Sequence, residues 1–325
     1  MSTSALRAAL AAALGDGNVR VDVRLAPFTT FKVGGPADLF VEPRNSDELL
    51  TSIRLAAEHN VPLTMLGGGS NVLISDEGIR GLVVRPRGGE IAREGPDRVR
   101  ADAAVTINGL VRWLISHELA GLEAWAGTPG TVGGGIHGNA HWGGRLLSEF
   151  VASVRVASRT GEVASVAASE MAFGYDRSRL QGSGEVLLSA SFVVHPGDAS
   201  AMREDARRSL HYRKRTQPLA SPSAGCIFQN PLAEVALPDG MPRSAGALVD
   251  RAGLKGVREG GAVVSSTHAN FVVNTGTATA HDIRTLIERC RDAVRQRFGV
   301  DLREEIVYLG AFPDASGGSR VHSGH

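Results

Sequence analysis

Two glycine-rich segments constrain the fold of this chain more than any other feature of its sequence. The first, residues 67–71, reads GGGSN between two apolar runs; the second, residues 127–144, reads GTPGTVGGGIHGNAHWGG. Both are richer in glycine than a tight turn requires, and glycine lets a backbone lie close to another group because it has no side chain. Backbone N–H groups in such loops bind phosphate oxygens. The two segments therefore predict a site that holds one extended diphosphate ligand from two sides.

The order of elements around the first segment argues against two common nucleotide-binding motifs. Apolar runs at residues 37–41 and 63–66, with a helix beginning after Asn45 between them, predict a strand–helix–strand unit. Asn45 is a favoured N-cap residue, and the acidic residues that follow it suit the positive end of the helix dipole. The glycines follow the second strand and do not open a helix, so GGGSNV is not the dinucleotide fingerprint. The chain has no Walker sequence either.

Charge and cysteine content disfavour several classes of protein. The 325 residues carry a formal net charge of +1, which argues against a broad surface for nucleic acid or anionic lipid. The two cysteines, Cys226 and Cys290, form neither a disulfide framework nor a metal-binding set. No apolar run approaches the ~20 residues of a membrane span. We expect a cytoplasmic, monomeric protein that binds neither nucleic acid nor membrane.

The pattern along the chain divides it into three regions and predicts a mixed α+β fold. Residues 1–80 hold a short amphipathic first helix and the strand–helix–strand unit, and residues 81–199 are rich in strands, with one helix that begins after Thr106 and ends at Gly121. Residues 200–310 start with the basic run HYRKRTQP and contain a helix over about residues 280–297, with Cys290 on its apolar face. Residues 311–325 are small and polar, which predicts a disordered tail.

Six segments occur together in an order that resembles one known family. They are FTTFKVGGPADLFVEP, LGGGSNVLISDEGIRGLVV, GLEAWAGTPGTVGGGIHGNA, SPSAGCIFQNP, AGLKG and HANFVVN. In this order they resemble the UDP-N-acetylenolpyruvoylglucosamine reductase (MurB) family, over residues 28–310. The resemblance implies a two-part FAD-binding region of the vanillyl-alcohol-oxidase (PCMH) type, followed by a C-terminal α+β domain that binds substrate. The tyrosine-bearing loop of the longer family class is not apparent, so the chain is similar to the shorter class.

The resemblance implies an enzyme of bacterial peptidoglycan precursor synthesis. NADPH would reduce non-covalent FAD, and the flavin would pass a hydride to C3 of UDP-N-acetylglucosamine enolpyruvate; a proton at C2 would complete UDP-N-acetylmuramate. Non-covalent binding is expected because Ser70 follows the glycines, where related flavoproteins often carry the histidine that bonds the flavin. Two alternatives stay open: another FAD-dependent sugar or alcohol oxidoreductase, and a flavin-binding scaffold without catalysis.

The resemblance assigns the cofactor to the two glycine-rich segments. In the first segment, the residues expected to bind FAD are Gly67, Gly68, Gly69, Ser70 and Asn71. In the second, they are Gly130, Thr131, Gly133, Gly134 and Asn139. The competing interpretation is that both segments are only tight turns.

Two of the expected catalytic residues are acids. Cys226 stands where many family members have the serine that protonates C2, and a thiol, with an ordinary pKa of ~8.5, is a stronger acid than an alcohol. The alternative for Cys226 is a small core thiol. Glu305, in LREEIVYLG, matches the C-terminal catalytic glutamate. Alternation along a strand puts Glu304 on the opposite face.

The expected catalytic arginine is displaced. Many members read Tyr-Arg-x-Ser where this chain has an aspartate, Asp176, directly after the tyrosine and an arginine, Arg177, one position later. We predict Arg177 as the catalytic arginine, with Arg179 as the alternative.

The remaining assignments concern the substrate. Asn230 resembles the asparagine that contacts the UDP diphosphate, Gln229 stands where lysine is common, and Arg213 in the basic run is expected to add diphosphate contacts. Thr216 falls where a substrate-binding lysine often lies. His137 and His141 have the spacing of zinc-protease ligands, but no glutamate follows the first, so no metal site is expected.

Overall fold

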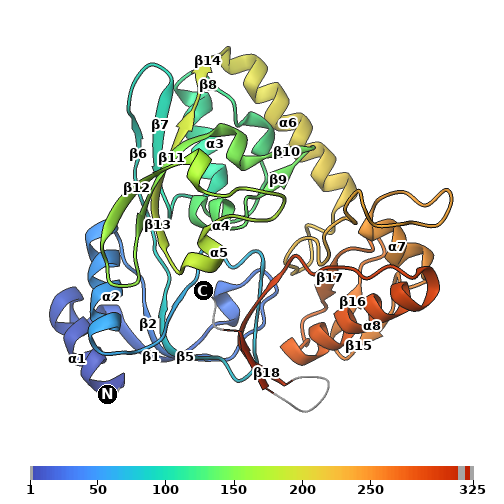
Figure 1. Cartoon of the computed structure of the whole chain (residues 1–325), viewed down its shortest axis with the longest axis horizontal. Helices are drawn as coiled ribbons and strands as arrows, with labels where there is room; N and C mark the ends of the chain where they lie inside the picture. The colour runs from blue at the N-terminus through green and yellow to red at the C-terminus, as the bar shows by residue number, and fades with distance from the viewer. Residues whose placement is uncertain (1–2, 314–318, 323–325) are drawn as a thin grey trace.

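The computed structural model describes residues 3–313 and 319–322 and has the expected α+β architecture (Figure 1). Its first region contains α1 (Thr3–Leu14), β1 (Val19–Arg24), β2 (Pro36–Val41), α2 (Ser46–Glu58), β3 (Leu63–Met65) and β5 (Ile79–Val84). The sheet has the order β1-β2-β5-β3, with β2 and β3 parallel to β5. The Asn45 side chain accepts the Glu48 N–H at 2.9 Å, which confirms the predicted cap of α2. The predicted boundary at residue 80 falls inside β5.

The second region is an antiparallel sheet of order β12-β11-β13-β7-β6. Its strands are β6 (Ile91–Arg93), β7 (Arg98–Asp102), β11 (Val151–Ala157), β12 (Val163–Ala167) and β13 (Val186–Val193). Thr106 caps α3 (Ile107–Ser116), as predicted. The helix ends at Ser116 and not at Gly121, because β8 (Leu119–Ala120) follows and pairs with β14 (His195–Pro196). Shorter elements complete the region: α4 (Val132–His137), β9 (His141–Trp142), β10 (Arg145–Leu146) and α5 (Leu180–Ser183).

The third region is connected to the second by α6 (Ala199–Thr216), which runs from one to the other (yellow in Figure 1). It contains α7 (Ala245–Arg251), β15 (Arg258–Glu259), β16 (Ala262–Val264), β17 (Val272–Asn274) and α8 (Ala280–Phe298). The predicted apolar face of α8 is confirmed, because its residues are buried in the core of this region: Ile283, Leu286, Ile287, Cys290 and Val294.

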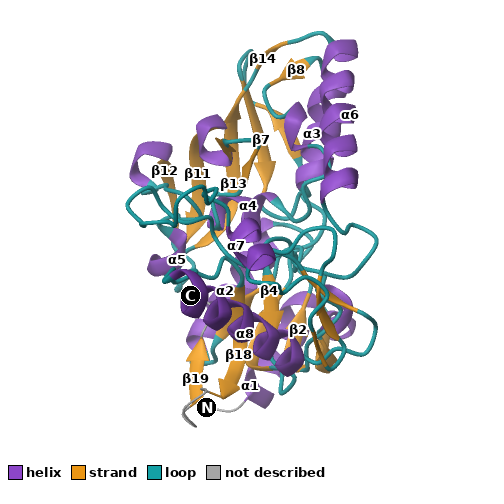
Figure 2. Ribbon diagram, turned by 90° about the vertical axis from the view of Figure 1, so that its right-hand side faces the viewer, coloured by secondary structure: helices purple, strands orange, loops and turns teal. Residues whose placement is uncertain are grey.

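A small sheet pairs a strand of the first region with strands late in the sequence. β4 (Val72–Ile74), directly after the first glycine-rich segment, pairs in parallel with β18 (Val307–Pro313), and β19 (Ser319–His322) pairs with β18 (Figure 2). Residues 311–313 and 319–322 therefore form strands and not the expected disordered tail, because β18 provides an edge for pairing. Residues 314–318 and 323–325 lie outside the described part. Among the described residues, no helix is long and apolar enough to cross a membrane.

Candidate active site

The first glycine-rich segment presents a row of free backbone donors. In the described part of the chain, the N–H groups of residues 67–71 donate to no protein acceptor. Gly69 has a φ of +63°, and a β-carbon there would lie 2.1 Å from the Phe28 carbonyl oxygen, so only glycine fits. The Thr30 N–H holds the segment in place through the Gly69 carbonyl at 2.9 Å. Unpaired N–H groups in a glycine-rich segment suit phosphate oxygens, so the segment fits the diphosphate of FAD.

The two glycine-rich segments touch each other. A β-carbon on Gly68 would lie 2.7 Å from the Gly130 Cα, and one on Gly67 would lie 2.8 Å from the Thr131 Oγ1. A β-carbon on Gly130 would meet the Ser70 Oγ at 2.8 Å. Part of the glycine content is therefore required by the contact between the segments, a reason that sequence analysis did not identify.

The second segment contains a short helix where sequence analysis expected only a loop. Thr131 caps α4 by accepting the Gly134 N–H at 3.3 Å. The Gly133 N–H donates to the Ala103 carbonyl at 2.8 Å, so the protein itself uses this donor. The sequence did not predict α4, because three consecutive glycines disfavour a helix.

Asn139 is buried, and the protein uses both ends of its amide. Its Nδ2 donates to the Gly174 carbonyl at 2.7 Å, and its Oδ1 accepts the Ser148 N–H at 3.0 Å. These bonds anchor the turn at residues 174–177. A direct contact between Asn139 and the cofactor stays a prediction.

Cys226 and Glu305 lie on neighbouring segments. The Glu305 N–H donates to the Ile227 carbonyl at 2.8 Å, and the Asn71 side chain donates to the Glu305 carbonyl at 3.1 Å. The Glu304 side chain turns away to α8, where its Oε1 accepts from Arg291 at 2.8 Å. Because side chains alternate along an extended chain, Glu305 faces the other way, and its catalytic role stays a prediction.

Burial controls the acidity of both predicted acids. It raises the pKa of Glu305 to about 8, with a further rise from nearby Asp176 that His141 partly offsets. It also raises the pKa of Cys226 to about 12, with a further rise from Glu305, whereas a hydrogen bond with Asn270 acts in the opposite direction. Both groups are therefore protonated at neutral pH, as a general acid has to be.

Three further side chains join this cluster. The His141 Nδ1 lies 3.0 Å from the Asp176 Oδ1, and the His141 Nε2 lies 3.4 Å from the Tyr175 hydroxyl. Sequence analysis named Asp176 only as the residue that displaces the arginine. Arg177 is exposed beside the turn, and Arg179 forms an ion pair with Glu185 at 2.6 Å. Sequence spacing could not reveal the bond between His141 and Asp176, which are 35 residues apart.

Arg213 is a buried cation on α6. Its Nη2 donates to the Thr128 Oγ1 at 2.7 Å, and its guanidinium lies 3.4 Å from the centre of the Trp142 ring. Burial lowers the pKa of Arg213 to about 10. Its Nε has no hydrogen-bond partner among the described residues, so a donor remains for an anionic ligand.

The two remaining substrate predictions fall on the segment after Cys226. Asn230 is exposed, and its Oδ1 accepts the Ala245 N–H at 3.0 Å at the start of α7. Gln229 is half-buried, and its N–H donates to the Arg303 carbonyl at 2.9 Å. Both predicted contacts with substrate stay predictions.

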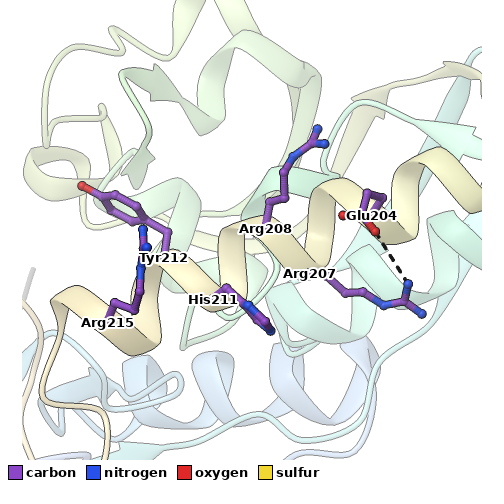
Figure 3. Close-up of a pocket in the computed structure, with 6 residues that line it drawn as sticks. All are labelled: Glu204, Arg207, Arg208, His211, Tyr212 and Arg215. Atoms are coloured by element: carbon purple, nitrogen blue, oxygen red, sulfur yellow. Dashed lines mark ion pairs between the residues drawn. The ribbon is translucent and has the colours of Figure 1, made fainter.

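One group among the described residues has the composition of a metal site: the ligand atoms of His141, Asp176 and Glu305 lie within 4.8 Å of one another. The hydrogen bond between His141 and Asp176 occupies one ligand atom of each residue. This favours a pair that shares a proton over a metal site. A shallow hollow lies elsewhere, on the exposed face of α6 (Figure 3), opposite the buried Arg213. Its lining residues are Glu204, Arg207, Arg208, His211, Tyr212 and Arg215.

Unpaired backbone donors at residues 67–71, together with two buried acids and a buried cation, fit an FAD-dependent oxidoreductase. Residues 37–167 match the family model of an FAD binding domain, and residues 217–309 match that of UDP-N-acetylenolpyruvoylglucosamine reductase, C-terminal domain. The chain is 39% identical to UDP-N-acetylenolpyruvoylglucosamine reductase 2 of Symbiobacterium thermophilum, over 91% of this chain and 94% of that protein. It is 40% identical to the reductase of an Anaeromyxobacter species, over 91% and 90%. The chain belongs to the UDP-N-acetylenolpyruvoylglucosamine reductase family.

A solved structure agrees with this assignment. The crystal structure of the reductase (MurB) from Thermus caldophilus superposes with a TM-score of 0.75 at 30% sequence identity, covering 89% of this chain and 99% of that chain. The fold class expected from the sequence, an FAD-binding region followed by a C-terminal α+β domain, is confirmed.

Proposed function

We propose that this chain uses NADPH and FAD to reduce UDP-N-acetylenolpyruvoylglucosamine to UDP-N-acetylmuramate for peptidoglycan synthesis. The observation that carries the proposal is the placement of Cys226 and Glu305 on paired segments, joined by Asn71 to the free donors of the first glycine-rich segment. Family membership supports the same reaction.

Different residues of the chain would bind the cofactor, bind the substrate and transfer the proton. FAD supplies hydride transfer when it is bound, and residues 67–71, with Gly130 and Thr131, would hold its diphosphate. Cys226 holds the proton for C2 of the substrate. Glu305, protonated near neutral pH, can replace that proton. Arg213 and Asn230 would bind the charged groups of the substrate, with Gln229 beside them.

The finer assignments are also proposals. The cofactor region comprises the first two regions, with the boundary between them after β5, and the third region binds substrate. Arg177 adds a positive charge from the exposed side of the turn. We infer a cytoplasmic monomer, because the substrate is a nucleotide-linked precursor and the net charge of +1 offers no broad surface for membranes or nucleic acid.

The visible absorbance of the purified protein tests the reaction. We expect a yellow protein that bleaches anaerobically with NADPH and recovers its colour with UDP-N-acetylenolpyruvoylglucosamine. Acid denaturation should release the flavin into the supernatant. Recovery of colour with O2 and an alcohol, but not with this substrate, would favour the other FAD oxidoreductases. A yellow protein that no donor bleaches would favour the scaffold.

A further inference from the structure

The turn that carries Asp176 directs this side chain into the protein and leaves Arg177 outside. The backbone N–H groups of Gly174 and Arg177 each donate to the other's carbonyl, at 3.0 and 3.2 Å. Asp176 lies inside this turn with a φ of +51°, a region that aspartate tolerates better than most residues. Asn139 fixes the turn through the Gly174 carbonyl. Strained conformations held by surrounding bonds concentrate at functional sites.

Asp176 supports His141 from the buried side. Only 9% of the Asp176 side chain is exposed, against 29% of the His141 side chain, so the carboxyl group is the more deeply buried member of the pair. The His141 Nδ1 forms a hydrogen bond with the Asp176 Oδ1 at 3.0 Å, and a protonated imidazole donates through this nitrogen. The other carboxylate oxygen, Oδ2, has no partner among the described residues. The His141 Nε2 is left for the Tyr175 hydroxyl, at 3.4 Å, or for a ligand.

Among the described residues, the groups that contact His141 directly carry no positive charge. Asp176 and Glu305 are both carboxyl groups, and the nearby cation Arg213 packs on the Trp142 ring instead. Burial raises the pKa of Tyr175 to about 12, so its hydroxyl is neutral. The hydrogen bond to Asp176 raises the pKa of His141 above its ordinary value, although burial opposes this effect. The titratable groups near the imidazole are Tyr175, Asp176, Arg213, Cys226 and Glu305.

We propose that protonated His141 binds the carboxylate of the enolpyruvyl substrate and that Asp176 is its positioning residue. This inference rests on the proposed function. Glu305 is protonated near neutral pH and does not repel an anion, but a substrate carboxylate beside the Asp176 carboxyl group needs a cation between the two. The His141 imidazolium offers that charge and a donor at Nε2, and such charge-assisted bonds are among the strong ones. Negative charge on this carboxylate grows as the enolate forms, so the same contact lowers the barrier.

The arrangement explains the displaced arginine. At position 176 the family resemblance leads us to expect an arginine, and this chain has an aspartate. Asp176 forms a hydrogen bond with His141 of the second glycine-rich segment. The positive charge therefore comes from residue 141, and the residue in the arginine's place orients it.

Separate half-reactions test this proposal, with His141→Gln, Asp176→Asn and the surface variant His117→Gln as a matched control. We expect His141→Gln to bleach with NADPH at the wild-type rate but to bind the substrate about 10- to 100-fold more weakly, the usual loss of a charged hydrogen bond. Wild-type affinity for substrate should fall as pH rises through the raised pKa of His141, and His141→Gln should show only the smaller fall that comes from ionisation of Glu305. His117→Gln should match the wild type in every measurement.

A second measurement needs no substrate and no turnover. Histidine NMR of the holoenzyme, with His141→Gln to assign the signal, should show a His141 pKa above the ordinary value of histidine. Asp176→Asn should lower the His141 pKa towards its ordinary value. An unshifted His141 pKa in the wild type would overturn the positioning role of Asp176.

The outcomes separate the two proposals. If the wild type reoxidises with the substrate but His141→Gln binds it equally well, this inference is wrong and the proposed function stands. If the wild type does not reoxidise with the substrate, the proposed function fails, and this inference fails with it. A stoichiometric metal ion in the purified protein, whose removal reproduces the His141→Gln defect, would also overturn the inference, because the charge would then belong to the metal.

Discussion

The side-chain amide of Asn71 donates a hydrogen bond to the backbone carbonyl of Glu305 at 3.1 Å. This bond links the first glycine-rich segment to the segment just before β18, which carries a predicted catalytic acid 234 residues later in the sequence. Immediately after these residues, β4 and β18 pair in parallel. The first glycine-rich segment and Glu305 are therefore joined both by a side-chain hydrogen bond and by the strands that follow them, so a change in one is expected to disturb the other.

Replacing Asn71 tests this connection. Asn71→Ala removes the bond to Glu305 and a polar side chain predicted to face FAD. We expect a loss of about 1 kcal/mol in the free energy of unfolding, the typical net value of one hydrogen bond, together with a lower flavin content. Denaturant unfolding and the ratio of flavin to protein absorbance measure both. Loss of stability in the apoprotein with unchanged flavin content would show that Asn71 is only structural.

Contact between the glycine-rich segments makes a second prediction. Gly68→Ala would bring a methyl group within 2.7 Å of the Gly130 Cα, in a place where backbone has to move. We expect a protein that folds but retains FAD at least about tenfold more weakly, because a shifted loop misplaces several donors at once.

Gly17→Ala is the matched control for this variant, since no atom lies within 4 Å of the added carbon. Flavin release on dilution, followed by fluorescence, compares the two variants with the wild type. Equal retention by all three proteins would contradict the required close contact.

Local sequence signals predicted the elements that depend on neighbouring residues. Asn45 and Thr106 cap their helices as expected, and the apolar face of α8 is buried, because capping and helical periodicity are set within a few residues. A local signal gave the wrong end for α3, which was predicted to end at Gly121. The helix ends at Ser116, because residues 119–120 pair with a distant strand.

The missed parts of the site depend on contacts between distant residues. A bond between His141 and Asp176 needs the second glycine-rich segment and the turn at residues 174–177 to lie side by side, which Asn139 arranges. Each residue alone gives no signal, since a histidine between glycines and an aspartate after a tyrosine are both ordinary in loops. The family resemblance drew attention to the displaced Arg177 but gave no reason to look for a histidine.

Replacing Arg177 tests the catalytic arginine predicted from the sequence. Because Arg177 is exposed, its charge is screened, and exposed charges contribute ~0.2–1 kcal/mol. Arg177→Ala should therefore slow flavin oxidation by the substrate only about two- to fivefold and leave reduction by NADPH unchanged. Arg179→Ala, which breaks the ion pair with Glu185, should lower stability without this kinetic effect. A larger kinetic defect in Arg179→Ala would show that the assignment is wrong by two residues.

The raised pKa of Glu305 predicts a pH dependence of stability. Burial raises this pKa from 4.5 to about 8, so between these values the folded state binds more protons than the unfolded state. Stability therefore falls as pH rises across this window. Glu305→Gln removes this contribution, so its melting temperature should vary less with pH than that of the wild type. His141, whose pKa is also raised, contributes in the same direction and leaves a residual slope. Equal slopes in both proteins would contradict a buried, protonated Glu305.

Replacing Cys226 tests the proton donor in the second half-reaction alone. Cys226→Ala should bleach with NADPH at the wild-type rate, but flavin oxidation by the substrate should slow by about 10²-fold or more, the usual contribution of a positioned acid. Cys226→Ser should keep much of the activity, because its hydroxyl carries a proton to the same place. Burial raises the pKa of the Cys226 thiol to about 12, so the thiol stays protonated and adds no alkaline limb to the pH profile at accessible pH.

Cys290→Ala is the matched control for this series, because Cys290 is buried in the core of the third region. It should lose stability by a few kcal/mol at most, as small core truncations do, and should carry out both half-reactions at the wild-type rate. Stopped-flow traces of flavin oxidation across pH, recorded for all four proteins, separate the two cysteines. A Cys226→Ala enzyme that reoxidises as fast as the wild type would make Cys226 a packing residue, and the proton at C2 would then have to come from Glu305 or from solvent.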